Sequence, residues 1–206
     1  MKPNFFRPEI FLKLTLKCSD VDDLQWLADE ALQLKEMTPK QIIYCRSIDT
    51  ASGLYRMLAA RNNLLDIVEM FHAHLPNDLK DKIVNQFNRG NSNIRILIST
   101  VAFGMGIDVK DIQRVVHWGC PETVEEYWQE VGRCARGGGQ GEAIMYKTPW
   151  SVNKSRTKAC MLDLLQSTEC IRSKVLNVFK FKNVKIDESF KKHNDRCCNR
   201  CEEKKM

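Results

Sequence analysis

Residues 94–139 read IRILISTVAFGMGIDVKDIQRVVHWGCPETVEEYWQEVGRCARGGG, and this stretch decides the fold. It contains two short apolar runs, 94–98 and 115–118, with the length and composition of buried strands. Each run is followed by a polar loop that contains glycine. In an open parallel sheet such loops lie at the carboxyl ends of the strands, where ligands bind. The stretch therefore predicts an α/β fold with a ligand-binding edge.

A later loop, residues 132–139, carries Arg133 and Arg136 among glycines. A guanidinium group is a planar, permanently charged fork that suits phosphate oxygens. Gln129 precedes Arg133 by one helical turn and lies on the same face, where it could orient a water molecule or a phosphate. An arginine that meets a transferring phosphoryl group is an arginine finger. The loop therefore indicates nucleotide chemistry, and the alternative is two surface arginines in a flexible turn.

Two segments carry a family resemblance: STVAFGMGID at 99–108 resembles motif V, and QEVGRCARGG at 129–138 resembles motif VI, of RecQ-like DNA helicases of superfamily 2. The resemblance implies a second RecA-like motor domain of an enzyme that unwinds DNA in the 3′-5′ direction with ATP and Mg²⁺. It assigns catalytic roles to Arg136, Arg133 and Gln129, with the arginines directed at the γ-phosphate of ATP. It assigns nucleotide contacts to Asp108 and Gly106.

The same resemblance places DNA contacts at the ends of predicted strands, at Arg46, Ser47, His72 and Thr100. Arg46 and Ser47 follow the run 41–45 as in motif IV, and an arginine and a hydroxyl at a strand end can hold phosphate. Ser47 serves equally well as a plain helix cap, and His72 as a structural histidine, so both alternatives stay open at this point.

The chain departs from the family pattern at three positions. His74 and Ala135 stand where glycine is usual, and Gly137 stands where aspartate is usual. Glycine often marks a positive φ, so these changes bear on the local backbone. Both motif VI arginines are present despite the changes around them.

Four of the nine cysteines are grouped near the end of the sequence. Cys198 and Cys201 form a CxxC pair, and Cys197 is adjacent to it. Cys170 lies upstream, separated from Cys197 by 26 residues. Four thiolates complete a closed tetrahedral site, which predicts a structural zinc ion. The layout resembles the zinc-binding subdomain of Werner-type RecQ-like helicases, and His193 is a competing fourth ligand. The other cysteines are expected to be buried or free thiols: Cys18, Cys45, Cys120, Cys134 and Cys160.

Charge divides the chain into two parts. Residues 1–150 carry 18 Lys and Arg against 19 Asp and Glu, whereas residues 151–206 carry 14 against 7. The basic part indicates a polyanion partner such as DNA, or else a solvated basic surface. We expect a RecA-like domain over 1–148 and a helical zinc-binding subdomain over 149–206. No apolar run approaches 18 residues, so no membrane span is expected.

The periodicity predicts a parallel, doubly wound sheet in which strands alternate with helices. Residues 7–14 are expected to form an extended connector. The predicted strands are 41–45, 67–71, 94–98, 115–118 and 142–147. The predicted helices are about 20–37, 47–61, 76–88, 121 through at least 129, 152–166 and 168–181.

An ATP-driven motor needs a phosphate-binding loop, GxxxxGK[ST], and an acidic motif that holds Mg²⁺. Neither is present in these 206 residues. We therefore expect a first motor domain to precede this segment and expect no ATP turnover from the segment alone. The alternative is a self-standing, zinc-stabilised DNA-binding adaptor without ATPase activity. The resemblance also implies a nuclear location, and the sequence leaves the oligomeric state unknown.

Overall fold

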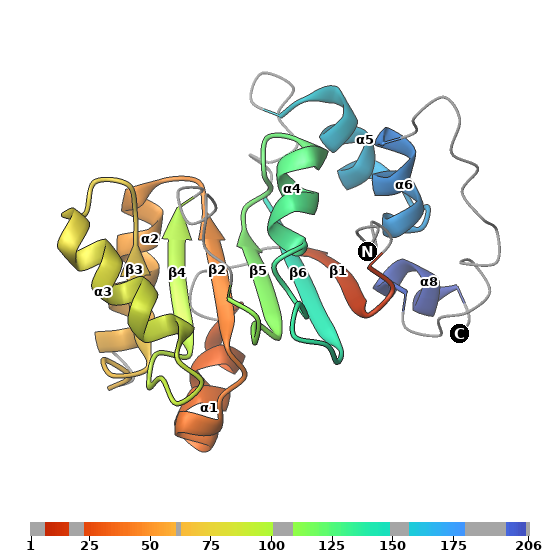
Figure 1. Ribbon diagram of the computed structural model, residues 1–206. Helices are drawn as coiled ribbons and strands as arrows, with labels where there is room; N and C mark the ends of the chain where they lie inside the picture. Colours follow the sequence, from red (N-terminus) through yellow and green to blue (C-terminus); the bar gives the residue numbers. More distant parts are fainter. Residues whose placement is uncertain are drawn as a thin grey trace.

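The protein is built around one six-stranded sheet, seen in a computed structural model that describes residues 7–16, 23–60, 63–100, 109–148, 157–179 and 197–204 (Figure 1). The strands are β1 (Ile10–Leu16), β2 (Gln41–Cys45), β3 (Val68–Phe71), β4 (Ile96–Thr100), β5 (Arg114–Trp118) and β6 (Gly141–Lys147). Their order across the sheet is β1-β6-β5-β2-β4-β3, and every pairing is parallel. The expected parallel, RecA-like sheet is confirmed.

Helices cover both faces of the sheet. They are α1 (Gln25–Leu34), η1 (Lys35–Met37), α2 (Ile48–Tyr55), η2 (Arg56–Ala60), α3 (Asn77–Asn88), α4 (Val124–Val131), α5 (Ala159–Gln166), α6 (Ile171–Val178) and α8 (Asn199–Glu203). One apolar core joins one face of the sheet to α3, α4, α5 and α6. A second core joins the other face to α1 and α2. Successive residues of β2 alternate between the cores, because side chains of a strand point to opposite faces in turn.

Two helices begin where polar side chains cap them. Ser47 accepts a hydrogen bond from the backbone N–H of Thr50, at 3.1 Å, and so starts α2. Thr123 accepts one from the N–H of Glu126, at 3.0 Å, while the Glu126 carboxylate accepts one from the N–H of Glu122. The Ser47 and Thr123 bonds satisfy backbone donors that a helix leaves unpaired at its amino end, and the Glu126 bond holds the chain just before the Thr123 cap.

Residues 10–16 form the edge strand β1 and not merely an extended connector, so the expectation for this segment was incomplete. Ile10, Leu12 and Leu14 are buried, while Lys13 between them is exposed. This alternation is the signature of a strand with one face on the core. The sequence predicted only a connector here, because the strand that pairs with this segment, β6, lies more than 120 residues later in the chain.

Several element boundaries also differ from the prediction. The strand predicted at 94–98 is β4, which begins and ends two residues later, because its register with β2 runs from Ile96 to Thr100. Of the helix predicted over 152–166, residues 152–156 lie outside the described residues; α5 begins at Ala159, since the capping residue Lys158 has an extended backbone. The start predicted near residue 20 for the first helix lies outside the described residues.

The C-terminal helices α5, α6 and α8 gather at the β1 end of the sheet (Figure 1). They share the core of the sheet, because Leu164, Val175 and Cys198 are buried in the same apolar cluster as β1 and α4. The boundary at 148/149 between two domains stays a prediction. Within the part of the chain that the structure describes, no helix is long and apolar enough to cross a bilayer.

Candidate nucleic-acid, nucleotide and metal sites

Three of the predicted DNA-contacting residues come together at the carboxyl ends of neighbouring strands. Arg46 follows β2, His72 follows β3, and Thr100 ends β4. The register pairs Cys45 with Thr100, and Phe71 with the preceding Ser99, so the three positions form one row along the sheet edge. The parallel pairing that the sequence predicted is what brings them together.

Arg46 already has acidic neighbours in this structure. Its guanidinium lies 3.8 Å from a carboxylate oxygen of Glu122 and 3.8 Å from one of Glu126. All three side chains are partly exposed, so these contacts contribute little to stability and leave Arg46 able to change partner. Ser47 acts as a helix cap, as predicted, and its hydroxyl also lies 2.9 Å from that of Thr50.

His72 is half-buried beside the exposed His74, with the two rings edge to face at 6.3 Å. Among the described residues, the buried Nδ1 of His72 has no hydrogen-bond partner. A histidine that served only to complete the local structure would normally have one. The motif V loop, with Gly106 and Asp108, lies outside the described residues.

The arginine loop, defined here as residues 132–137, follows α4 at the opposite end of the sheet. The N–H of Ala135 donates to Ile112 O at 2.8 Å, and the N–H of Gly137 donates to Lys110 O at 2.7 Å. Both acceptors lie just before β5, so the backbone of the loop sits beside the amino ends of the strands. The row Arg46, Thr100 and His72 and the arginine loop therefore occupy opposite ends of the sheet.

The two arginines of the loop have different surroundings. Arg133 is buried, at 5% exposure, and hydrogen-bonds the phenol of Tyr44 on β2. Arg136 is exposed, and its Nε donates to Gly132 O at 3.0 Å. Gln129, one turn earlier on α4, is also exposed. Arg136 and Gln129 can thus meet a ligand from outside, whereas Arg133 is part of the framework beneath them.

The framework around Arg133 is a buried polar cluster. Burial raises the pKa of Tyr44, although the Arg133 guanidinium opposes this, so the phenol stays neutral. The Tyr44 ring stacks on His117 with centroids 5.6 Å apart, and His117 Nε2 lies 2.8 Å from a carboxylate oxygen of Glu130. Buried hydrogen-bonded networks hold their members in one arrangement. The cluster thus fixes α4, and with it the start of the arginine loop, against β2 and β5.

The departures from the family pattern in this loop have a structural basis. Ala135 has φ +56°, a left-handed conformation that usually favours glycine. A Cβ at Gly137 would lie 2.8 Å from Lys110 O, so the backbone approach excludes an aspartate in this arrangement. The backbone at residue 135 thus has the left-handed conformation that the family's usual glycine favours, even though the residue here is alanine.

The aromatic residues of α4 pack in the core. Tyr127 is 1% exposed and Trp128 is 6% exposed. This burial excludes stacking of either ring on a nucleic-acid base in this conformation.

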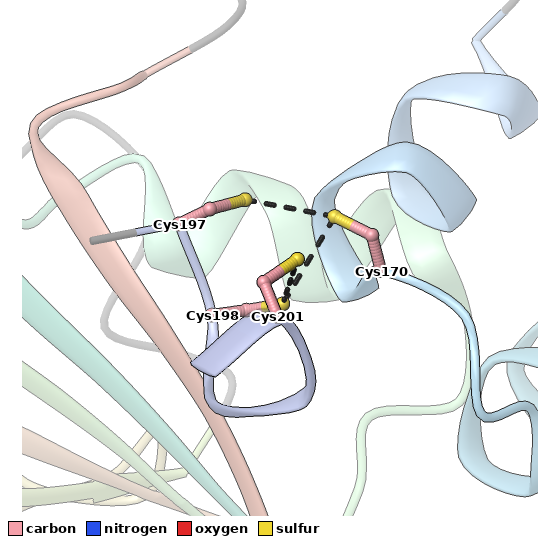
Figure 2. Close-up of side chains that lie close together, drawn as sticks. All are labelled: Cys170, Cys197, Cys198 and Cys201. Atoms are coloured by element: carbon pink, nitrogen blue, oxygen red, sulfur yellow. Dashed lines mark hydrogen bonds between the residues drawn. The ribbon is translucent and has the colours of Figure 1, made fainter. Parts of the chain in front are cut away.

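The four predicted metal-ligating cysteines meet at one point (Figure 2). Cys170 caps α6, and Cys197, Cys198 and Cys201 approach it from the start of α8. All four sulfur atoms lie within 4.8 Å of one another, and the Sγ–Sγ distances from Cys170 are 3.5 Å to Cys197 and 3.9 Å to Cys198. A disulfide needs about 2.0 Å. Tetrahedral Zn²⁺ with bonds of about 2.3 Å places its sulfur ligands about 3.8 Å apart, so the four cysteines fit such an ion.

Ionisation of the cluster is also compatible with metal binding. Hydrogen bonds from the thiols of Cys197 and Cys198 hold the pKa of Cys170 below its ordinary value. Burial raises the pKa of Cys201 to about 12. A metal must displace protons from such thiols, so binding is expected to strengthen as pH rises. His193, the alternative fourth ligand, lies outside the described residues.

Sequence reasoning missed the residues that hold these sites in place. The most prominent are Arg7, Lys40, Tyr44, His117 and Arg172, each of which bonds a residue distant in sequence. For Lys40, a positive charge immediately before a buried strand was a local signal of a special role. For the other four residues, the bonding partner depends on which helices and strands pack together.

Residues 22–138 match the family described as helicase conserved C-terminal domain. The mouse bifunctional 3′-5′ exonuclease/ATP-dependent helicase WRN is 28% identical over 216 aligned residues, covering 96% of this chain and 15% of that protein. The ATP-dependent DNA helicase RecQ of Pasteurella multocida is 30% identical over 146 residues, covering 71% of this chain and 22% of that protein. The chain thus spans less than a quarter of either relative.

Among solved structures, Saccharomyces cerevisiae Dbp5 bound to RNA and ADP BeF3 aligns with a TM-score of 0.59. The sequence identity is 22%, and the alignment covers 84% of this chain and 46% of that chain. This similarity supports the fold.

Proposed function

Because the chain belongs to the helicase conserved C-terminal domain family, with RecQ-like helicases among its relatives, we propose that it is the second RecA-like motor domain of an ATP-dependent DNA helicase with 3′-5′ polarity. Its sequence holds no phosphate-binding loop, so ATP and Mg²⁺ would be bound by a first motor domain supplied from elsewhere. We further propose that residues 149–206 form the zinc-binding subdomain and that the helicase acts in the nucleus.

One observation carries the proposal. The arginine loop holds an exposed arginine, Arg136, and a buried one, Arg133, which is hydrogen-bonded to Tyr44 of the sheet. A finger needs one guanidinium at the surface, where it can reach the γ-phosphate, and a rigid support behind it. In this proposal Arg136 neutralises the charge that develops on the transferring phosphoryl group. Gln129 orients the attacking water, and Arg133 holds the loop.

The DNA would lie along the row Arg46, His72 and Thr100 at the carboxyl ends of the strands. Arg46 would leave Glu122 and Glu126 for a phosphate oxygen, and Gly106 and Asp108 would complete the nucleotide side of motif V. Closure on ATP and opening after hydrolysis would move this row relative to the first domain. Such domain closure is how motor proteins convert nucleotide state into displacement.

The arginine role predicts the effect of one substitution. In the protein that carries both motor domains, Arg136→Ala should lower kcat for DNA-stimulated ATP hydrolysis on the order of a thousandfold, with DNA binding retained. Arg56→Ala, which changes an exposed arginine on η2, is the control and should leave kcat unchanged. Equal rates for Arg136→Ala and the parent enzyme would refute the finger. The 206-residue chain by itself should show no turnover above buffer.

We also propose that the four cysteines hold one structural zinc ion. Native mass spectrometry of the purified chain should show one bound zinc. Cys198→Ser should lose it and lower the melting temperature, because metal-binding energy contributes to the folding energy of this segment. Cys160→Ser, outside the cluster, is the matched control. Full zinc content and unchanged stability in Cys198→Ser would overturn the assignment.

A zinc-stabilised DNA-binding adaptor without ATPase activity is the second candidate. The observation that favours it is the altered motif VI, where Ala135 and Gly137 replace the residues usual in the family. The Arg136→Ala comparison separates the two candidates, because an adaptor has no use for an exposed finger.

A further inference from the structure

The arginine loop is held by a guanidinium from outside the helicase motifs. Arg7, three residues before β1, has a side chain that is 16% exposed and forms an ion pair with Glu9. It donates to Gly132 O at 2.7 Å and also to Cys134 O. These two carbonyl groups flank Arg133 on either side. One planar fork therefore fixes the backbone of the loop at the point where α4 ends and its carbonyl groups lack helical partners.

Arg7 is itself held from the cysteine cluster. Arg172 lies two residues after Cys170, in the first turn of α6. Its guanidinium donates to Arg7 O at 2.8 Å, to Ile10 O, and to Cys197 O at 3.4 Å. A single side chain thus ties together the backbone of Arg7, the start of β1 and the backbone of a metal-ligating residue.

The cysteine segment also pairs directly with β1. The N–H of Leu12 donates to Cys197 O at 3.2 Å. The side-chain amide of Asn199 accepts from the N–H of Leu14 and donates to Leu14 O, both at 3.2 Å. These bonds cover the outer edge of the sheet, which would otherwise expose unpaired backbone groups. β1 is thus held between β6 on one side and residues 197–199 on the other, so the placement of Arg7 before it depends in part on that segment.

From these contacts we infer that Arg7 is a positioning residue for the arginine loop, and that metal at the four cysteines fixes Arg7 through Arg172. The path runs from the cysteine cluster to Arg172, then to the backbone of Arg7, and finally through its guanidinium to Gly132 and Cys134. Arg7 touches no nucleotide in this scheme. The inference rests on the proposed function only for its catalytic consequence, since the path itself is a set of contacts within this chain.

Amide hydrogen exchange of the full chain tests the path without nucleotide. The reporters are the N–H groups of Ala135 and Gly137, which donate to Ile112 O and Lys110 O. Arg7→Ala should speed their exchange on the order of tenfold, as expected when hydrogen bonds from a charged donor are lost. Arg172→Ala and removal of zinc with a chelator should speed the same amides.

The control is Arg95→Ala, because Arg95 also donates to a backbone carbonyl, that of Thr38 at 2.6 Å, on another part of the sheet. It should leave the reporters unchanged. Arg7→Lys keeps a cation and should show a smaller effect, and it replaces Arg7→Ala if the alanine variant fails to fold. Zinc content is measured for each variant, and Arg7→Ala should retain its zinc.

Unchanged reporter exchange in both Arg7 variants would overturn the role of Arg7. Faster exchange in Arg7→Ala together with no response to chelation or to Arg172→Ala would overturn the link to the metal. In the protein with both motor domains, Arg7→Ala should lower kcat while KM for ATP stays the same. If exchange responds and kcat does not, the contact path stands and the proposed role of the arginines fails.

Discussion

At the scale of single residues, close approach around the arginine loop restricts side-chain size. A Cβ at Gly141 would lie 2.3 Å from Cys134 Sγ and 3.1 Å from Ala135 Cβ. Cys134 cannot easily retreat, because it is fully buried and its thiol donates to Gln113 O at 3.0 Å. At Gly141, the first residue of β6, this strand and the arginine loop therefore come into direct contact.

We expect Gly141→Ala to lower the free energy of unfolding by about 1 to 3 kcal/mol through overpacking. Gly53→Ala is the matched control, because Gly53 lies within α2 and a Cβ there meets nothing within 4 Å. That control should stabilise the protein by up to about 1 kcal/mol through helix propensity. Urea denaturation of both variants measures the difference, and equal effects of the same sign would contradict the packing argument.

At the scale of elements, a buried lysine joins α3 to the sheet. Lys40 is fully buried just before β2, and its ammonium donates to Phe87 O at 2.8 Å, to Arg89 O at 3.1 Å and to a carboxylate oxygen of Asp111 at 2.6 Å. These partners lie at the end of α3 and just before β5. The three donors of one ammonium group thus satisfy carbonyl groups at a helix end and a carboxylate near the arginine loop.

Lys40→Met should lower the free energy of unfolding by about 3 kcal/mol, since it keeps the apolar stem but leaves buried acceptors unpaired. Lys35→Met, at an exposed lysine on η1, is the control and should change stability by less than about 0.5 kcal/mol. Thermal and urea unfolding give the comparison. A Lys40→Met protein as stable as the parent would show that these contacts contribute nothing net.

At the scale of the whole molecule, buried protonated groups predict a loss of stability at alkaline pH. Burial raises the pKa of Cys134 from 9.0 to about 11, and it raises the pKa of Tyr44 and Tyr127 above their ordinary value of 10.0. The folded state therefore holds protons that the unfolded state releases first. The contribution of these groups to stability should be constant up to about pH 9 and should fall as pH rises through 11.

The Cys134→Ala variant isolates one part of this effect. It should be less stable than the parent at neutral pH because it leaves a small cavity, yet its stability should fall less steeply between pH 9 and 11. Urea denaturation at fixed pH values measures both slopes. Parallel slopes for the two proteins would show that Cys134 keeps its proton equally well in both states.

Much of the molecule could be predicted from local pattern alone. Short, mostly apolar runs such as 41–45, separated by amphipathic helices with Ser47 and Thr123 as caps, specify a parallel sheet, because period and capping are local properties. The spacing of Cys197, Cys198 and Cys201 likewise indicates a thiolate site, because CxxC spacing lets two sulfurs reach one ion. The sequence by itself thus determined the fold class and the strand-end positions of Arg46, His72 and Thr100, and it indicated the cysteines of the sulfur cluster.

Only the tertiary structure decided which residues support those sites. Whether Arg133 or Arg136 is exposed depends on how α4 packs over Tyr44, and both look alike in sequence. The edge strand β1 pairs with β6, more than 120 residues later, and Arg7 and Arg172 find backbone carbonyls that any residue could have supplied. Carbonyl groups carry no residue-specific signal, so contacts to them leave no trace in the sequence until the chain has folded.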